Sequence, residues 1–247
     1  MNIFFLSCRN VFRNKRRTLF TTFSIVMGVA SLQLFDGFIK YTLWGLREST
    51  IKNGLGHLQI TKNEKYFTSG SFDPFEYLLQ NQDSVIKVLK QVPEVKKVVP
   101  QINFSGNISL NGKTGIVMMN ASPPELSTEL FGFRSIIEGR DLNEDEMYTI
   151  ILGDGVAKKM DAKIGDEVTV LTTVKGGGVN AVDFKVVGIC TMGNRELDNI
   201  MVYTTLSSAN GFLFINTVPL LIVVLDNTDH TAVIHKTLTE LLSKANL

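Results

Sequence analysis

The feature that most constrains this chain is an uncharged run that follows a cluster of basic residues. Residues 9–44 read RNVFRNKRRTLFTTFSIVMGVASLQLFDGFIKYTLW, and residues 18–35 carry no charge. An apolar run with positive charge at one end is typical of a membrane helix whose basic end stays in the cytoplasm. We therefore predict a single transmembrane helix over residues 18–44 in the inner (plasma) membrane, with the N-terminus cytoplasmic and residues 45–247 extracytoplasmic. The orientation rests on Arg9, Arg13, Lys15, Arg16 and Arg17.

Two other interpretations of residues 18–44 are weaker. A cleaved signal peptide has a short apolar core followed by a cleavage site of small residues. Here Gly28-Val29-Ala30 lies inside the apolar run, and the next segment adds the apolar residues Phe38, Ile39, Tyr41, Leu43 and Trp44. A buried helix of a soluble protein gives no reason for five basic residues to crowd one end. We favour an uncleaved anchor.

Residues 1–17 are expected to form a cytoplasmic amphipathic and basic segment. Apolar and polar side chains within residues 2–13 fall on opposite sides of a helix, which suits a helix lying in the membrane interface. An unstructured, weakly apolar tail is the alternative. The segment holds five of the 25 basic residues and none of the 24 acidic ones, so the remainder is mildly acidic. A mildly acidic body argues against a nucleic-acid partner.

A stripe of small residues in the predicted helix bears on its partners. Ser24, Gly28 and Ser31 follow one another at spacings of four and three, which would let another membrane helix approach closely. Near the outer end, Phe35 and Phe38 are candidates for contact with acyl chains, and ordinary lipid-facing or core side chains are the alternative.

Asp36 and Lys40 lie on the outer part of the same predicted helix. They are four residues apart and share a face. We favour separate solvation of these side chains at the helix end over an ion pair.

Residues 45–247 are predicted to form a mixed α/β core domain with two subdomains, which makes the chain α+β overall. A strand-rich subdomain over residues of about 135–215 is expected as an insertion, and Asn111-Gly112 is the strongest hairpin signal. Residues 136–142 are expected to be a turn-rich connection. Alternation and helical periodicity predict strands at 58–61, 95–104, 108–110, 114–119, 149–152, 167–174, 183–189, 199–203 and 219–225, and helices at 83–92, 123–131, 153–160, 206–213 and 231–242.

No residue pattern indicates a phosphate or cofactor site. Residues 106–114, GNISLNGKT, have five residues between the glycines, where a phosphate loop has four, and they join two predicted strands. Residues 176–178, Gly-Gly-Gly, are expected to be a hairpin tip. We predict no cofactor and no catalytic residue in this chain.

Metal and disulfide chemistry is not indicated either. His230 and His235 are five residues apart, which is not the spacing of a metal pair on a helix, and His57 is expected to be a surface or capping residue. The acidic run at residues 141–146 lacks the alternation and glycine of a calcium loop. Cys8 and Cys190 would lie on opposite sides of the membrane and could not pair.

Six stretches of the chain resemble the permease subunits of ABC transporters of the MacB/FtsX superfamily, and in particular the lipoprotein-releasing permeases. Their order and spacing follow the first membrane helix and the periplasmic core domain of that superfamily. They are RNVFRNKRRTLFTTFSIVMGVASL (9–32), GHLQI (56–60), EGRDL (138–142), ILGDGVAKKMDAKIGDEVTVL (151–171), FKVVGI (184–189) and LDNIMVYTTLSSANGFL (197–213).

The resemblance implies a mechanotransmission cycle in which a separate cytoplasmic ATPase subunit binds ATP and drives the membrane helices. It also implies a second permease copy as a partner and lipoprotein release toward the outer membrane as the function. The family's three further membrane helices, which contact the ATPase, would follow residue 247, so we expect a fragment, a truncated form or a split gene. An FtsX-like regulatory domain, or MacB-like export of another substrate, is the alternative function.

Overall fold

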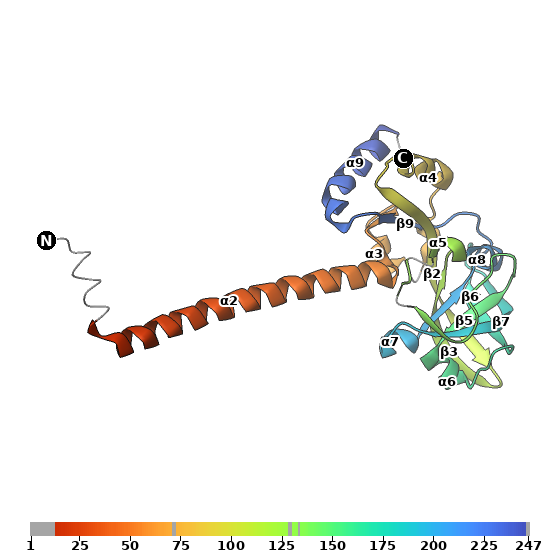
Figure 1. Cartoon of the computed structure of the whole chain (residues 1–247). Coiled ribbons are helices and arrows are strands. Elements are labelled where there is room, and N and C mark those ends of the chain that lie inside the picture. Colours follow the sequence, from red (N-terminus) through yellow and green to blue (C-terminus); the bar gives the residue numbers. More distant parts are fainter. Residues whose placement is uncertain (1–12, 71–72, 128–129, 133, 246–247) are drawn as a thin grey trace. The chain divides into compact units, whose positions relative to one another are not determined.

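The computed structural model describes residues 13–70, 73–127, 130–132 and 134–245 (Figure 1). The chain divides into two compact units, Met1–Glu48 and Ser49–Leu247, and each is described by itself. The predicted interfacial helix at residues 2–13 lies outside the described residues except for Arg13.

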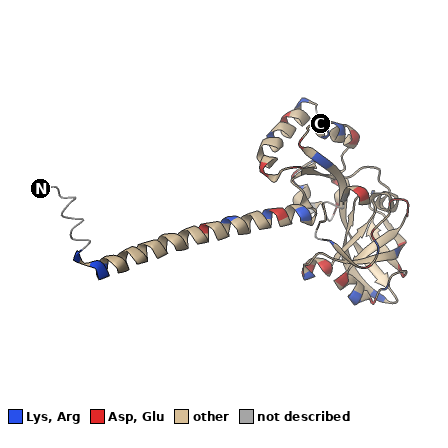
Figure 2. Ribbon diagram, viewed as in Figure 1, with Lys and Arg blue, Asp and Glu red and all other residues tan. Residues whose placement is uncertain are grey.

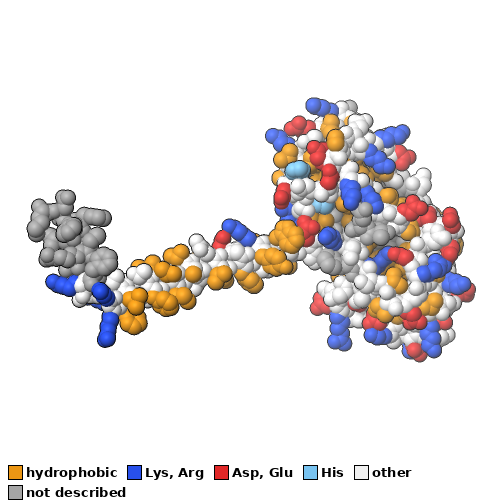
Figure 3. Space-filling model, viewed as in Figure 1, with side chains coloured by type: hydrophobic (Ala, Val, Ile, Leu, Met, Phe, Trp, Pro, Cys, Tyr) orange, Lys and Arg blue, Asp and Glu red, His pale blue; other side chains and the backbone are white. Residues whose placement is uncertain are grey.

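The first unit is dominated by one long helix, α2, Lys15–Thr50. None of its residues is buried, and Figure 3 shows hydrophobic side chains along its length. At 1.5 Å per residue it is about 54 Å long, more than the hydrocarbon core of a bilayer. It is the one described helix that is long and apolar enough to cross a membrane, with a mean hydropathy of 1.6 in its most apolar window.

The predicted helix at residues 18–44 lies within α2, which is longer at both ends. It begins at Lys15 and continues past Trp44 to Thr50. The six residues after Trp44 include no proline, and one glycine among them does not break a helix. The helix therefore continues to the turn that contains Asn53 and Gly54, which adopt non-helical backbone angles.

The second unit is built around a closed barrel of six strands. Each strand pairs with the next in the order β2-β3-β8-β5-β7-β6, and β6 pairs again with β2. The β3·β8 and β5·β7 pairs are parallel and the others are antiparallel. The strands are β2 Val95–Leu110, β3 Lys113–Ala121, β5 Thr149–Gly153, β6 Glu167–Thr173, β7 Val179–Thr191 and β8 Met201–Thr204.

The barrel interior is filled by inward-facing apolar side chains. Three phenylalanines pack edge to face there, with Phe184 and Phe104 both against Phe212. Alternation along the strands supplies the rest, because successive side chains point to opposite faces. The buried residues of this cluster include Ile102, Ile108, Val117, Met119, Ile150, Leu152, Val168, Val170, Val186 and Val202.

A smaller lobe extends one side of the barrel. The first half of β2 pairs with β9, Leu220–Leu225, which in turn pairs with β1, Leu58–Thr61. All six residues of β9 are buried, as expected for a strand paired on both sides. Helices α4, Gln82–Leu89, and α9, Thr231–Lys244, contribute Leu89, Ile234 and Leu238 to the buried cluster of this lobe.

Shorter elements connect the strands. The helices are α3 Tyr66–Ser69, α5 Pro124–Ser127, α6 Asp154–Met160, α7 Arg195–Asp198 and α8 Leu206–Leu213. Single turns are η1 Ile51–Leu55, η2 Pro74–Tyr77 and η3 Thr228–His230. The strand β4, Ser135–Gly139, pairs with β7 outside the barrel cycle.

The α+β fold class is confirmed, while two details of the strand assignment were wrong. Residues 136–142 were expected to be a turn-rich connection, but Ser135–Gly139 form β4. Two strands were expected between Val95 and Leu110, but β2 is continuous over 16 residues and serves both the lobe and the barrel. Residues 135–215 contain β4 to β8, and four of these strands close the barrel together with β2 and β3.

The two predicted hairpin turns are confirmed. Asn111 and Gly112 both have positive φ, 49° and 80°, as a two-residue hairpin turn requires. Gly176 and Gly177, at 95° and 86°, turn the chain between β6 and β7. Residues 106–114 therefore belong to a strand hairpin and precede no helix that could hold a phosphate.

Replacement of Phe184 should destabilise the second unit strongly. Phe184 is fully buried and contacts Tyr148 and Phe212, so Phe184→Ala should lower the free energy of unfolding by about 3–5 kcal/mol. Chemical denaturation followed by circular dichroism would measure the loss. Ile116→Ala is the control, because Ile116 is 73% exposed on β3, and it should change stability little. Equal losses in both variants would contradict a core inside the barrel.

Candidate functional site

The basic residues that predict topology lie at the start of the long helix. Lys15, Arg16 and Arg17 form its first turn, Arg13 lies two residues before it, and all four are exposed. Figure 2 shows Lys and Arg in blue at this end of the helix. Arg9 lies outside the described residues. The next charged residue along the helix is Asp36, so the charge pattern that suggested an orientation is carried on one continuous helix.

The small-residue stripe of α2 is open. Ser24 donates its hydroxyl to the carbonyl oxygen of Phe20 at 2.9 Å, so its polar atom is turned back onto the helix. A Cβ atom at Gly28 would meet nothing within 4 Å. Together with Ser31, these residues leave a shallow face against which another helix could pack.

The C-terminal half of α2 carries the two candidate substrate contacts. Phe35 and Phe38 are 62% and 64% exposed. Beside them, Lys40 Nζ lies 2.8 Å from Asp36 Oδ2. We had favoured separate solvation of these two side chains, but their spacing of one helical turn brings them together.

A glycine-containing turn follows α2 and enters the second unit. Gly54 and Gly56 have φ of 98° and 65°. A Cβ atom at Gly54 would lie 2.4 Å from Cε1 of Phe131, and one at Gly56 would lie 2.3 Å from Cγ2 of Ile222. The Gly54 amide donates to the carbonyl oxygen of Leu130 at 3.1 Å. Only glycine fits both positions, so the turn is held tightly against the core of the unit.

A cavity of about 210 Å³ lies beside this turn, on the outer face of the barrel. The register of β2, β3 and β8 brings several of its lining residues side by side. Met118 of β3 lies opposite Met201 of β8, and Asn120 lies between Asn103 of β2 and Tyr203 of β8. The lining residues are Asn53, Gly54, Leu55, Gln101, Asn103, Met118, Asn120, Phe131, Met192, Leu197, Met201 and Tyr203.

Amide side chains form a small network in the cavity wall. Asn103 Oδ1 accepts hydrogen bonds from Gln101 Nε2 at 3.2 Å and from Asn120 Nδ2 at 2.7 Å. Gln101 and Asn120 are only 4% and 3% exposed. Their own carbonyl oxygens, together with Oδ1 of Asn53, are buried without a hydrogen-bond partner among the described residues.

Sequence reasoning missed this cavity. Two sequence patterns indicate the residues that line it. Gln101 and Asn103 alternate with apolar residues on β2, and Met118 and Asn120 are likewise two residues apart on β3. Side chains two apart on a strand share a face, so each pair marks one polar outer face. The pairing of β3 with β8 across some 80 residues of sequence was not foreseeable from these patterns.

An arginine stacks on the aromatic residues next to the cavity. The Arg134 side chain is 5% exposed, and its Cζ lies 5.1 Å from the centroid of the Tyr203 ring and 5.7 Å from that of Phe131. Arg134 Nη2 donates to both carboxylate oxygens of Asp141 at 2.7 Å. Burial raises the pKa of the Tyr203 hydroxyl far above its ordinary value, so this hydroxyl stays protonated.

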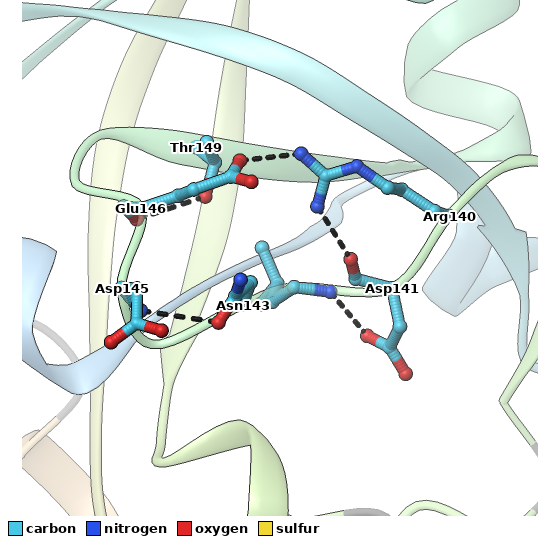
Figure 4. Close-up of polar contacts among 7 residues, drawn as sticks. Arg140, Asp141, Asn143, Asp145, Glu146 and Thr149 are labelled. Carbon is cyan, nitrogen blue, oxygen red and sulfur yellow. Dashed lines mark hydrogen bonds and ion pairs between the residues drawn. The ribbon is translucent and has the colours of Figure 1, made fainter.

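The acidic loop that follows β4 is closed on itself by polar contacts (Figure 4). Arg140 forms an ion pair with Glu146 and donates to the backbone carbonyl oxygen of Asp141 at 3.2 Å. The Asp145 amide donates to Asn143 Oδ1, and the Thr149 hydroxyl donates to the Glu146 carbonyl oxygen. These contacts fix the course of the loop between β4 and β5, while Asp141 and Glu144 also contact Arg134 and Ser207 outside it.

The described part of the chain holds no group of three histidine, cysteine or acidic side chains that could bind a metal ion. His57 connects β9 with the turn η3. Its Nδ1 accepts a hydrogen bond from the Leu225 amide at 3.1 Å, and its Nε2 lies 3.1 Å from the Thr228 hydroxyl. The cavity is lined by amides, thioethers and aromatic rings, which are groups that bind ligands.

Comparison with known proteins places these features in a family. The family of MacB-like periplasmic core domains matches residues 18–241. A curated relative, the lipoprotein-releasing system transmembrane protein LolE of Haemophilus influenzae, is 23% identical over 103 residues, which are 41% of this chain. The match spans 25% of the length of that relative.

Two solved structures share the fold. The extracellular domain of the noncanonic ABC-type transporter YknZ from Gram-positive bacteria superposes with a TM-score of 0.55 at 16% identity, covering 76% of this chain and 95% of that one. The periplasmic region of MacB from Actinobacillus actinomycetemcomitans gives a TM-score of 0.54 at 18% identity, covering 78% and 86%. At these identities the likeness establishes the fold of the second unit.

Cys190 should be unreactive in the folded protein. It is fully buried, and burial, the largest cause, raises the pKa of its thiol from 9.0 to about 12. Because the thiolate is the nucleophile, the folded Cys8→Ser variant should react with a disulfide reagent at pH 8 at least about tenfold more slowly than the same variant in denaturant. The folded state favours the protonated thiol of Cys190. This preference adds to the free energy of unfolding below pH 9, and that addition should be lost as pH rises from 9 toward 12. Equal reaction rates would contradict the burial.

Proposed function

Because the chain belongs to the family of MacB-like periplasmic core domains, we propose that it is the N-terminal portion of a permease subunit in an ABC transporter of the mechanotransmission type. The observation that carries the proposal is the extent of the family match, residues 18–241, which takes in most of α2 as well as the folded unit. A single-pass helix that leads directly into the core domain is suited to passing motion from the membrane to that domain.

The proposed orientation has the basic start of α2 in the cytoplasm of the inner membrane and the second unit on the outer side. Four basic residues lie in or next to the first turn of α2, and residues 18–35 are uncharged. Basic residues are retained on the cytoplasmic side during insertion. Tyr41 and Trp44, whose rings stack 6.2 Å apart, suit the opposite interface.

The energy source in this proposal is a separate cytoplasmic ATPase subunit. The chain itself then needs no cofactor, and ATP acts through membrane helices that follow the core domain in other family members. A second permease copy is the proposed partner in the membrane, with contact along Ser24, Gly28 and Ser31, the open stripe of α2.

The proposed substrate is a lipoprotein released from the inner membrane toward the outer membrane. Support comes from the 23% identical relative, which is named as part of a lipoprotein-releasing system. Phe35 and Phe38, exposed near the outer end of α2, are the proposed contacts for acyl chains. MacB-like export of another substrate is the second candidate, favoured by the fold shared with MacB, and an FtsX-like regulatory role is the third.

Reversal of the basic cluster should disturb the orientation. Lys15→Glu, Arg16→Glu and Arg17→Glu together should lower, several-fold, the activity of an alkaline phosphatase fused after Leu247, because the enzyme folds only outside the cytoplasm. The matched control replaces three exposed lysines of the second unit, Lys163, Lys175 and Lys185, by glutamate. It reverses the same number of charges and should leave the phosphatase activity unchanged. An inactive phosphatase on the unaltered chain, despite normal expression, would refute the topology.

Lipoprotein release can be tested in cells by depletion of the protein. Lipoproteins of the outer membrane should accumulate in the inner-membrane fraction, as measured by density-gradient separation and immunoblotting. Phe35→Ala with Phe38→Ala should reproduce this defect, whereas Val29→Ala, on another side of α2, should not. An unchanged lipoprotein distribution on depletion would remove the lipoprotein proposal and leave the export of another substrate.

A further inference from the structure

Several residues that line the cavity beside the Asn53–Gly54 turn have hydrogen-bond acceptors without a donor. The carbonyl oxygens of Asn53, Gln101 and Asn120 are buried without partners in the described part of the chain. Buried carbonyl groups in native proteins are nearly always paired with protein, water or a bound molecule, and leaving them unpaired costs free energy. All three residues line one cavity of about 210 Å³, so a molecule bound there is a source of the donors that these oxygens lack.

We propose that this cavity binds a primary ammonium group carried on a short alkyl chain. An ammonium group offers three N–H donors and no acceptor, which matches three carbonyl oxygens that can only accept. With Asn103 Oδ1 accepting from both Gln101 and Asn120, the amide oxygens of these two residues are left without a donor.

The remaining lining suits the alkyl part of such a ligand. Met118, Met192 and Met201 contribute thioether side chains, and Leu55 and Leu197 contribute aliphatic ones. Methionine is unbranched and adapts its shape readily, so this lining can adjust to the alkyl chain of a ligand.

The charge next to the cavity favours a cation. Asp198 is 8% exposed and accepts hydrogen bonds from the amide of Met192, a lining residue, at 2.7 Å and from the hydroxyl of Thr191 at 2.5 Å. Neither donor is charged, and the positive charge of Arg134 is already paired with Asp141. A buried carboxylate with only neutral donors leaves a negative potential that a cationic ligand would lower in energy.

The same chemistry has two natural sources. One is the ethanolamine headgroup of a phospholipid, and the other is a lysine side chain of a polypeptide. The binding site does not depend on the transport proposal, so failure of one leaves the other standing.

The test is a titration of the full chain in phosphatidylcholine nanodiscs with n-propylammonium, followed by NMR of ¹³C-labelled methionine methyl groups. Saturable shifts should appear at the methyl groups of Met118, Met192 and Met201 and be absent at Met160, which is buried elsewhere. The neutral n-propanol and the anionic propionate should give no saturable shift. Equal shifts with all three compounds, or none with n-propylammonium, would overturn the proposal and leave a solvent-filled cavity.

Substitutions of the lining residues test whether n-propylammonium binds in this cavity. Gln101→Leu with Asn120→Leu should weaken n-propylammonium binding at least about tenfold, through loss of hydrogen bonds to a charged group. Asn53→Ala, in the partly exposed turn, tests the same point if the double variant fails to fold. Asn210→Leu is the matched control, because Asn210 also has an unpaired buried oxygen but lies outside this cavity, and binding should be unchanged. Unaltered binding in both cavity variants would contradict the site.

Two further arms identify the source of the ammonium group. Nanodiscs of phosphatidylethanolamine should reproduce the methionine shifts if the headgroup is the ligand. Addition of Nα-acetyl-lysine amide to phosphatidylcholine nanodiscs should reproduce them if the ligand is a lysine side chain.

Discussion

The pairing of β2 with β6 is the interaction on which the second unit depends, because it closes the barrel. Asn107, Ile108 and Ser109 lie opposite Leu171, Val170 and Thr169, and this short ladder removes the two open edges of a six-stranded sheet. Closure encloses Phe104, Phe184 and Phe212 and fixes which face of each strand points outward. The cavity beside the Asn53–Gly54 turn exists only because that outer face is fixed.

Much of the fold follows from local sequence patterns. The long helix, the Asn111-Gly112 hairpin and the buried strand at the C-terminal end are each determined by neighbours in sequence. The hairpin and the strand were predicted at nearly the observed bounds, whereas the helix extends three and six residues beyond its predicted ends. The strand Ser135–Gly139 was missed because Glu138 and Gly139 resemble a turn, whereas pairing with β7 holds them extended. Long-range pairing overrides local preference at such positions.

The cavity illustrates why a site is harder to predict than a fold. Its polar members come from β2 and β3, its thioethers from β3, β8 and the residue after β7, and its rim from the turn after α2. Each contribution is unremarkable alone, since an asparagine or methionine on a strand is more often solvated or packed. Only the register between strands distant in sequence brings unpaired amide oxygens into one small volume.

The pairing of β1 with β9 also affects how the second unit can be made. Leu58 lies opposite Val223, and a hydrogen bond joins His57 to Leu225 across 168 residues of sequence. During synthesis the first strand therefore has no partner until nearly the whole unit has emerged. Such non-local closure slows folding, so the early strand is the segment most in need of a chaperone while the rest of the chain is still being translated.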